Sequence, residues 1–188
     1  MIDMTHPTIL ICDKIADEAH GSIGQQRKWS GDPYVVHVRR VAAAAAALDG
    51  FSVEDVAAAL LHDVLEDVPA FTTAVLYRRL LNEGIPLESA AAILGMVLEL
   101  TDPYDHGSGL SRLEKRTLDW VRFPHKSRNA KRLKMLDRLD NLSGFIPKKM
   151  AYKYIPETTK MIELIGDADP VIAGRLAALV GKIRENIV

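Results

Sequence analysis

Residues 56–67 read VAAALLHDVLED, an alanine- and leucine-rich run that leads into four ionisable residues. An apolar run of this kind is typical of a helix packed in a core. On a continuous helix, His62 and Glu66 would share one face. Asp63 and Asp67 would share the neighbouring face. Burying such groups beside an apolar run costs free energy unless they are paired or bind a metal. The alternative is a solvated helix end whose acidic side chains face water.

The same helical pattern runs through the rest of the chain. Apolar residues recur at three- and four-residue spacing, and Gly or Pro marks most turns between them. The expected helices cover residues 7–19, 33–48, 52–67, 72–81, 86–100, 111–121, 127–142, 148–164 and 170–187. Ser52 with Asp55 resembles a capping box, and Pro156 should kink or break the helix that contains it. Residues 101–109 form a loop dense in turn formers. No stretch alternates as a strand does, so the sequence predicts an all-α fold.

Length and composition narrow the class of protein. A chain of 188 residues suits a single domain, expected here over residues 1–188. The formal net charge of −1 gives no global basic field, so no nucleic-acid partner is expected. The single cysteine, Cys12, excludes an internal disulfide framework and fits a reducing compartment.

No segment approaches the roughly 20 apolar residues that span a bilayer, and the N-terminus does not resemble a secretion signal. A cytoplasmic protein with no membrane contact is expected, whereas the oligomeric state stays open.

Two further polar residues, His37 and Asp137, stand on expected helices with apolar neighbours. Taken singly, His37 fits a satisfied core or surface histidine, and Asp137 fits a surface partner of Arg138. Together with His62 and Asp63 they supply two imidazoles and two carboxylates. This mixed nitrogen and oxygen set suits Mn²⁺, Fe²⁺ or Zn²⁺. A metal that prefers six ligands would keep positions open for water and for a phosphate oxygen.

Three segments resemble one known family. Residues 27–37 (RKWSGDPYVVH) are similar to its Arg-Lys-Ser-Gly-Glu-Pro-Tyr-x-x-His block. Residues 58–67 (AALLHDVLED) nearly match its His-Asp block, and residues 134–141 (KMLDRLDN) look like its Lys-Leu-Ala-Asp-Arg-Leu-His-Asn block. The family is that of the HD-domain metal-dependent phosphohydrolases. Within it, the chain resembles the hydrolase domain of RelA/SpoT-type (p)ppGpp enzymes, including the small alarmone hydrolases. The resemblance implies a single HD-domain helical bundle.

The resemblance also implies roles for named side chains. The metal ligands, usually to manganese (Mn²⁺) in this family, would be His37, His62, Asp63 and Asp137. The groups that position or deprotonate the attacking water would be Glu66 and Asp67. The substrate contacts would be Asn141 on the nucleoside and Arg27 and Lys28 on the purine or a phosphate. A hypothesis adds Arg112, Lys115 and Arg116 as cations that offset phosphate charge, the alternative being a solvated helix face.

Several positions depart from the family pattern. Trp29 is additional in its block, so either Arg27 or Lys28 could meet the base. Asp140 stands where a His is usual, and Gly144 stands where a hydroxyl group often helps to read guanine. The base specificity therefore stays open.

For two histidines outside these blocks the sequence predicts roles other than metal binding. His20 is expected as a cation at the end of the first helix, and His106 as an exposed loop residue.

The reaction favoured by these residues is removal of the 3′-pyrophosphate from (p)ppGpp, a small-molecule nucleotide. The alternative within enzymes is an HD-domain phosphatase that acts on another nucleotide or on NADPH. A different class is a non-catalytic helical module that binds a nucleotide or a protein. The six residues expected to bind metal and activate water argue against such a module, because a binder has no need for all of them.

Overall fold

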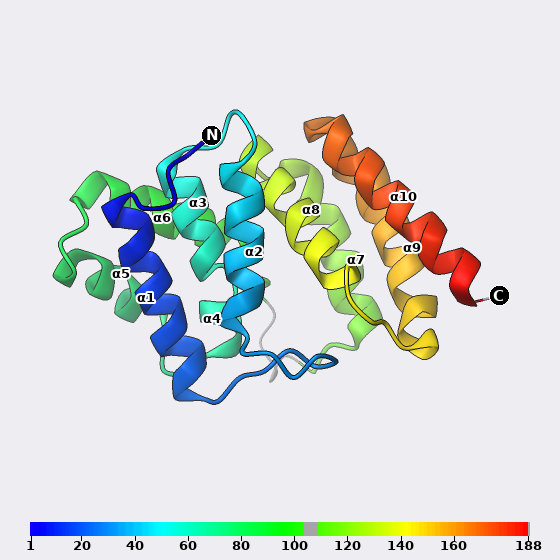
Figure 1. Ribbon diagram of the computed structural model, residues 1–188, viewed down its shortest axis with the longest axis horizontal. Coiled ribbons are helices and arrows are strands. Elements are labelled where there is room, and N and C mark those ends of the chain that lie inside the picture. The colour runs from blue at the N-terminus through cyan, green and yellow to red at the C-terminus, as the bar shows by residue number, and fades with distance from the viewer. Residues whose placement is uncertain (104–108, 188) are drawn as a thin grey trace. The chain divides into compact units, whose positions relative to one another are not determined.

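The computed structural model describes residues 1–103 and 109–187 of the chain. Every regular element in this described part is a helix, and extended backbone pairs there only as an isolated bridge between Gln26 and Pro33. The predicted all-α class is confirmed (Figure 1). The chain divides into two compact units, Met1–Thr101 and Asp102–Val188. A single domain over the whole chain stays a prediction. None of the helices described is both long and apolar enough to cross a lipid bilayer.

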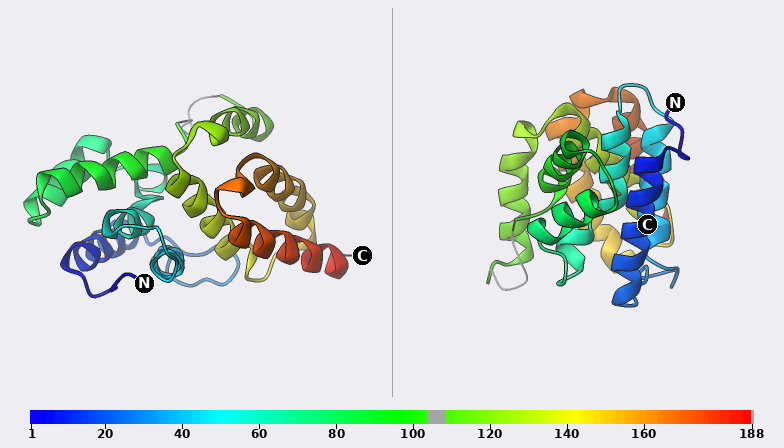
Figure 2. Two further views of the ribbon diagram at one scale, coloured as in Figure 1. Left: turned by 90° about the horizontal axis from the view of Figure 1, so that it is seen from above. Right: turned by 90° about the vertical axis from the view of Figure 1, so that its left-hand side faces the viewer.

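The first unit is built around its third helix. Its elements are α1 (Pro7–Ser22), α2 (Val35–Ala46), α3 (Val53–Leu61), α4 (Val64–Asp67), α5 (Thr73–Asn82) and α6 (Leu87–Leu100). Helix α3 packs against α1, α2 and α6 (Figure 2), and every residue from Val56 to Leu61 is 0% exposed. The small alanine side chains let neighbouring helices approach closely on several sides. This burial fixes the position of both ends of α3.

The predicted capping box begins α3. The N–H of Asp55 donates to Ser52 Oγ at 3.1 Å, and the N–H of Ser52 donates to Asp55 Oδ2 at 2.9 Å. Two backbone donors that the first helical turn leaves open are thereby satisfied.

The prediction of one helix over residues 52–67 is wrong, because the helix breaks at the His-Asp pair. Helix α3 ends at Leu61, and the single turn α4 begins at Val64. His62 Nδ1 bonds the carbonyl of Ala59 at 2.8 Å. That carbonyl is the acceptor that the N–H of Asp63 would use in a continued α-helix. A local bond from side chain to backbone thus competes with the helical ladder at this point.

The second unit is a layer of packed helices. Its elements are α7 (Arg112–Arg122), the 3₁₀ turn η1 (Phe123–His125), α8 (Arg128–Leu142), α9 (Lys148–Ile165), the 3₁₀ turn η2 (Gly166–Ala168) and α10 (Pro170–Ile187). Helices α8, α9 and α10 pack against one another around fully buried Met135, Ile165 and Ile172, and α7 contacts α9. Most of the predicted helices therefore form close to the expected ends. The expected loop at residues 101–109 is described only in part, and His106 lies outside the described residues.

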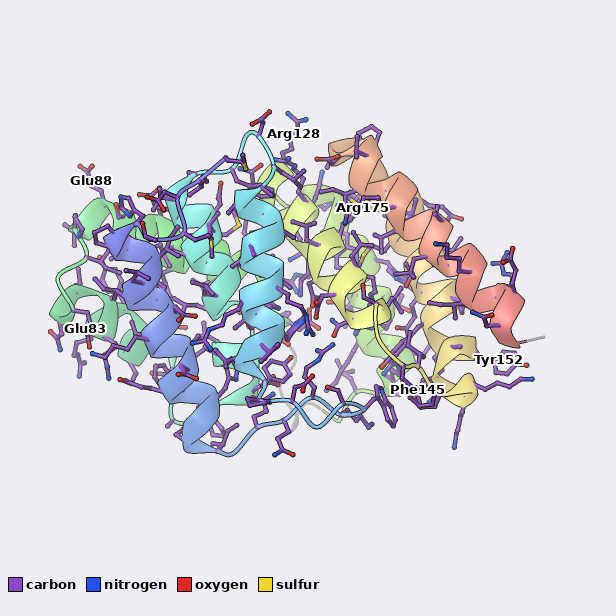
Figure 3. The ribbon with its side chains drawn as sticks, viewed as in Figure 1. Glu83, Glu88, Arg128, Phe145, Tyr152 and Arg175 are labelled. Atoms are coloured by element: carbon purple, nitrogen blue, oxygen red, sulfur yellow. The ribbon has the colours of Figure 1, made fainter. Side chains whose placement is uncertain are left out.

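The sequence predicts that Pro156 kinks or breaks its helix, and the structure shows no break there. The helix continues from Lys148 to Ile165 with Pro156 inside it. Pro156 is exposed, and Tyr152, one turn earlier, extends from the helix with 61% of its surface exposed (Figure 3). A proline removes the N–H that would bond the carbonyl one turn earlier. On a solvated face water can satisfy that carbonyl, so the helix tolerates the proline.

Candidate metal centre

Three of the predicted metal ligands lie together in the first unit. His37 is in the first turn of α2, His62 follows α3, and Asp63 precedes α4. Their ligand atoms all lie within 4.8 Å of one another. His62 Nε2 is 3.0 Å from Asp63 Oδ2, and His37 Nε2 is 3.6 Å from the same oxygen. The break between α3 and α4 allows the adjacent residues His62 and Asp63 to present both donor atoms to one point.

The surroundings of His62 fix which of its ring nitrogens faces this point. A carbonyl oxygen can only accept, so the bond to Ala59 places the proton of a neutral imidazole on Nδ1. Nε2 then carries the lone pair that a metal would use. Metal-binding histidines commonly have this arrangement, with the second nitrogen donating to a carbonyl. His37 and His62 are buried at 0% and 3% exposure, which excludes bulk water from their rings.

Tyr34 is a member of this cluster that the sequence analysis did not single out. Its hydroxyl donates to Asp63 Oδ2 at 2.7 Å. Its ring meets that of His37 edge-on, with centroids 5.4 Å apart. The residue immediately precedes α2 and stands three positions before His37, so helical spacing was the available signal. The hydroxyl orients the carboxylate that both histidines face.

The donor set fits a divalent cation. Two imidazole nitrogens and one carboxylate oxygen converge, one imidazole is held in the ligand tautomer, and a hydroxyl orients the carboxylate. Nitrogen and oxygen donors of this kind suit Mn²⁺, Fe²⁺ or Zn²⁺. The fit rests on His37, His62 and Asp63 alone.

Glu66 and Asp67, the two predicted acid–base residues, follow the ligand pair His62-Asp63 within about one helical turn. The N–H groups of Glu66 and Asp67 donate to the carbonyl of Asp63 at 3.2 and 2.9 Å, which winds α4 tightly after the ligand pair. Burial, and secondly the charge of Asp63, raise the pKa of Asp67. The Asp67 carboxylate accepts a hydrogen bond from Gln25 Nε2 at 2.7 Å.

His20 lies in the last turn of α1, as predicted, but its surroundings do not favour a cation. It is 1% exposed. Burial lowers its pKa, so the neutral ring is favoured. Its Nδ1 bonds Gln25 Oε1 at 2.7 Å, and its ring centroid lies 4.9 Å from that of Tyr34.

Asp137, the fourth predicted ligand, belongs to α8 of the second unit. Its Oδ1 accepts a hydrogen bond from Asn141 Nδ2 at 2.6 Å, one turn along the helix. Both residues are half-buried. An orienting bond of this kind is common for metal-binding carboxylates. The metal role of Asp137 and the nucleoside contact of Asn141 stay predictions.

The predicted cationic residues Arg27 and Lys28 lie in the loop between α1 and α2. The Arg27 guanidinium carbon is 5.9 Å from the ring centroid of Tyr34, whereas Lys28 Nζ is 5.1 Å from that of Trp29. Arg27 also ties the loop to itself, because its N–H donates to the carbonyl of Asp32 at 2.8 Å. Of the two cations, Arg27 is the one that contacts the ring beside the ligand set.

The three cations predicted on α7 are only partly solvated. Arg112 donates two hydrogen bonds to Glu157, each 2.9 Å long, and Arg116 donates to Asp119 at 3.1 Å. Lys115 is half-buried on the same helix. The two guanidinium groups therefore belong to an ion-pair network with acids of the second unit. Contact of any of the three with phosphate stays a prediction.

Comparison with known proteins agrees with this architecture. The described helices hold a histidine in the first turn of α2, a His-Asp pair between α3 and α4, and a later aspartate on α8. No family model matches the chain. Human guanosine-3′,5′-bis(diphosphate) 3′-pyrophosphohydrolase MESH1 is 35% identical over 132 residues, which cover 68% of this chain and 65% of the relative. The chain thus spans just under two thirds of that relative's length.

A solved structure shares the fold more widely. It is that of a metazoan ortholog of SpoT, described as hydrolysing ppGpp and playing a role in starvation responses. It matches with a TM-score of 0.72 at 24% identity, covering 93% of this chain and 94% of its own. The chain therefore has the fold of that ortholog and is similar in sequence to the human hydrolase.

Proposed function

We propose that the chain is a metal-dependent phosphohydrolase that removes the 3′-pyrophosphate from guanosine-3′,5′-bis(diphosphate), giving GDP and pyrophosphate. The pentaphosphate form would give GTP. The observation that carries the proposal is the cluster of His37, His62 and Asp63, whose ligand atoms lie within 4.8 Å of one another. Glu66 and Asp67 follow it within one turn. The 35% identical human relative bears the name of this activity.

The proposed ligands of the ion are His37, His62, Asp63 and Asp137, and the proposed ion is Mn²⁺. When bound, a divalent ion lowers the pKa of water and polarises a phosphoryl oxygen. His37 and His62 are buried, so bulk water does not compete for their ring nitrogens. Tyr34 holds the Asp63 carboxylate by its hydroxyl.

Glu66 and Asp67 are the proposed acid–base pair. Their backbone is tied to Asp63 through the hydrogen bonds of α4, so the two carboxylates start from a fixed point next to the ligand set. One of them would orient the attacking water and accept its proton. Such positioned general bases contribute about 10²- to 10⁴-fold to a rate.

The proposed substrate contacts are those that the resemblance to the family's sequence blocks implies. Arg27 is preferred over Lys28 for the purine, because its guanidinium already lies on the Tyr34 ring while Lys28 pairs with Trp29. Asn141 would contact the nucleoside. Arg112, Lys115 and Arg116 would offset phosphate charge. The location proposed for the enzyme is the cytoplasm, which the lone buried thiol of Cys12 supports.

A panel of nucleotides tests the proposal. The purified chain is assayed with ppGpp, pppGpp, NADPH and nucleoside monophosphates, each with Mn²⁺ and with chelator. Release of pyrophosphate from ppGpp, abolished by chelator and restored by Mn²⁺, is expected. Phosphate release from NADPH alone would assign the chain to the other branch of HD-domain phosphatases. Hydrolysis of none of these compounds would favour a binding module.

Asp63→Ala is expected to abolish the Mn²⁺-dependent hydrolysis, because it removes the oxygen that both imidazoles face. Circular dichroism should show helical content close to that of the wild type. The matched control is Asp32→Ala, which removes an exposed carboxylate in the preceding loop. Retained hydrolysis in Asp63→Ala would remove the residue from the metal site.

Glu66→Gln is expected to keep the metal and lose turnover. The amide has nearly the same shape but cannot accept a proton, so kcat should fall by about 10²- to 10⁴-fold. Metal affinity, measured by calorimetry, should stay within a few-fold of the wild type. Full turnover in this variant would transfer the acid–base role to Asp67.

A further inference from the structure

The side chain of Gln25 connects two buried groups that are distant in sequence. Gln25 Nε2 donates to Asp67 Oδ2 at 2.7 Å across 42 residues of sequence. Gln25 Oε1 lies 2.7 Å from His20 Nδ1. The amide thus stands between the end of α1 and the end of α4, with both of its polar atoms engaged.

The chemistry of the three groups fixes the direction of both bonds. A carboxylate can only accept, so the NH₂ of Gln25 faces Asp67 and its oxygen faces His20. His20 must therefore donate from Nδ1. Its Nε2 is buried and has no hydrogen-bond partner within residues 1–103 and 109–187, which fits a bare lone pair rather than a second N–H. A neutral His20 with the proton on Nδ1 satisfies the whole chain of bonds.

The backbone of Gln25 is held as firmly as its side chain. Its N–H donates to the carbonyl of His20 at 3.0 Å, and its carbonyl accepts from the N–H of Tyr34 at 3.0 Å. Tyr34 in turn donates from its hydroxyl to Asp63. One loop residue therefore links the end of α1, the start of α2 and the last residue of α4.

We propose that Gln25 and His20 are positioning residues for the reaction, with Gln25 holding the Asp67 carboxylate in one orientation and His20 holding the Gln25 amide. The inference rests on the proposed function, in which Asp67 belongs to the acid–base pair. A carboxylate held at Oδ2 cannot rotate freely about its Cβ–Cγ bond, so Oδ1 is presented in a constant direction. Outer partners of this kind typically contribute 10- to 100-fold to activity.

Gln25→Met is the first test. Met is close in size and removes both side-chain hydrogen bonds. We expect kcat for ppGpp to fall by about 10- to 100-fold, with KM changed less than about three-fold, since no substrate contact is lost. The matched control is Gln26→Met, the same change at the exposed neighbouring residue. Equal kcat in the two variants would overturn the proposal.

A double-mutant cycle separates positioning from a general structural role. In an Asp67→Asn background there is no carboxylate at residue 67 for Gln25 to hold, so Gln25→Met should lower the residual kcat less than about two-fold. A loss as large as that in the wild-type background would show that Gln25 acts through the fold, and the proposal would fall.

The His20 contribution is tested by a rescue pair. Asn can place an N–H near the position of the imidazole Nδ1, whereas Leu cannot. His20→Asn should therefore retain most of kcat, and His20→Leu should lose about 10-fold or more. His125→Leu, at an exposed histidine, is the control for the change to Leu. Equal losses in Asn and Leu variants that both keep wild-type helical content would overturn the role of His20.

Amide exchange provides a readout that needs no substrate. In the wild-type chain the Gln25 side-chain protons should exchange slowly with solvent in ¹H–¹⁵N spectra, and His20→Leu should accelerate the exchange at least about ten-fold. Fast exchange in the wild type would overturn the hydrogen-bond chain even if Gln25→Met cannot be purified. If the wild type hydrolyses no nucleotide, the proposed function fails and the kinetic role falls with it. Slow exchange would then still support the hydrogen bonds themselves.

Discussion

Asp119 is a buried carboxylate on α7, 1% exposed, and lies outside the proposed chemistry. Burial first, and then the charge of Asp102, raise the pKa of Asp119 to about 6. Its contact with Arg116 opposes this shift. An unfolded Asp titrates near about 4. Because the folded-state pKa is the higher one, the contribution of Asp119 to stability is complete below about pH 4 and is lost as the pH rises through 6.

Asp119→Asn should therefore stabilise the chain at high pH and not at low pH. The neutral amide avoids the cost of a buried charge and can still accept a hydrogen bond from Arg116. At pH 8 the free energy of unfolding should rise on the order of 1 to 3 kcal/mol, and at pH 4 it should change little. Urea denaturation at both pH values measures this, with the exposed Asp167 changed to Asn as control. An equal effect at the two pH values would contradict the assignment.

Residue chemistry explains how much of the candidate site the sequence could predict. His37, His62 and Asp63 are recognisable because each of these three ligating residues stands beside apolar helical residues, and the structure brings them together. The partners that orient the site are harder to find. Gln25 bonds Asp67 across 42 residues from a polar loop, where any Gln would have looked solvated. His20 was predicted to be a cation at a helix end, because local spacing contains no information on what covers that end.

At the scale of elements, local signals were the reliable ones. The Ser52 capping box is a contact between residues three apart, so the sequence alone could predict it. The break after Leu61 depends on the His62 side chain, which bonds the Ala59 carbonyl. Helical periodicity in the sequence does not predict such a bond. Pro156 was expected to kink or break α9, yet the effect of a proline depends on whether the freed carbonyl faces water, which is a property of the packed unit.

The capping box makes α3 sensitive to Ser52, the residue that caps its N-terminus. Ser52→Ala removes the oxygen that accepts from the Asp55 N–H, so a backbone donor at the start of α3 loses its partner. The free energy of unfolding should fall by about 1 kcal/mol. Ser143→Ala, where the hydroxyl only donates to the Leu139 carbonyl within α8, is the control and should cost less. Chemical denaturation compares the two variants. Equal losses would mean that the cap contributes nothing.

At the scale of the whole molecule, binding of the metal should be measurable as stability. A ligand at about 100 times its Kd adds about 2.7 kcal/mol to the free energy of unfolding, and each kcal/mol raises Tm by roughly 2 to 4 °C in a chain of this size. Mn²⁺ should therefore raise Tm by several degrees, and chelator should reverse the rise. Asp63→Ala should abolish the shift and Asp137→Ala should reduce it. An unchanged shift in Asp63→Ala would locate the ion elsewhere.

The burial of α3 also has an electrostatic consequence. The aligned peptide groups of a helix leave about half a negative elementary charge at its C-terminal end. His62 caps that end of α3, and the helix is packed between α1, α2 and α6 rather than against water. In such a low-dielectric surrounding the helix dipole is screened less than at the surface. A divalent cation held by His62 and Asp63 would sit at the negative pole of the central helix. The first unit can thus attract such an ion with one carboxylate of its own in the ligand set, since the backbone contributes part of the compensating charge.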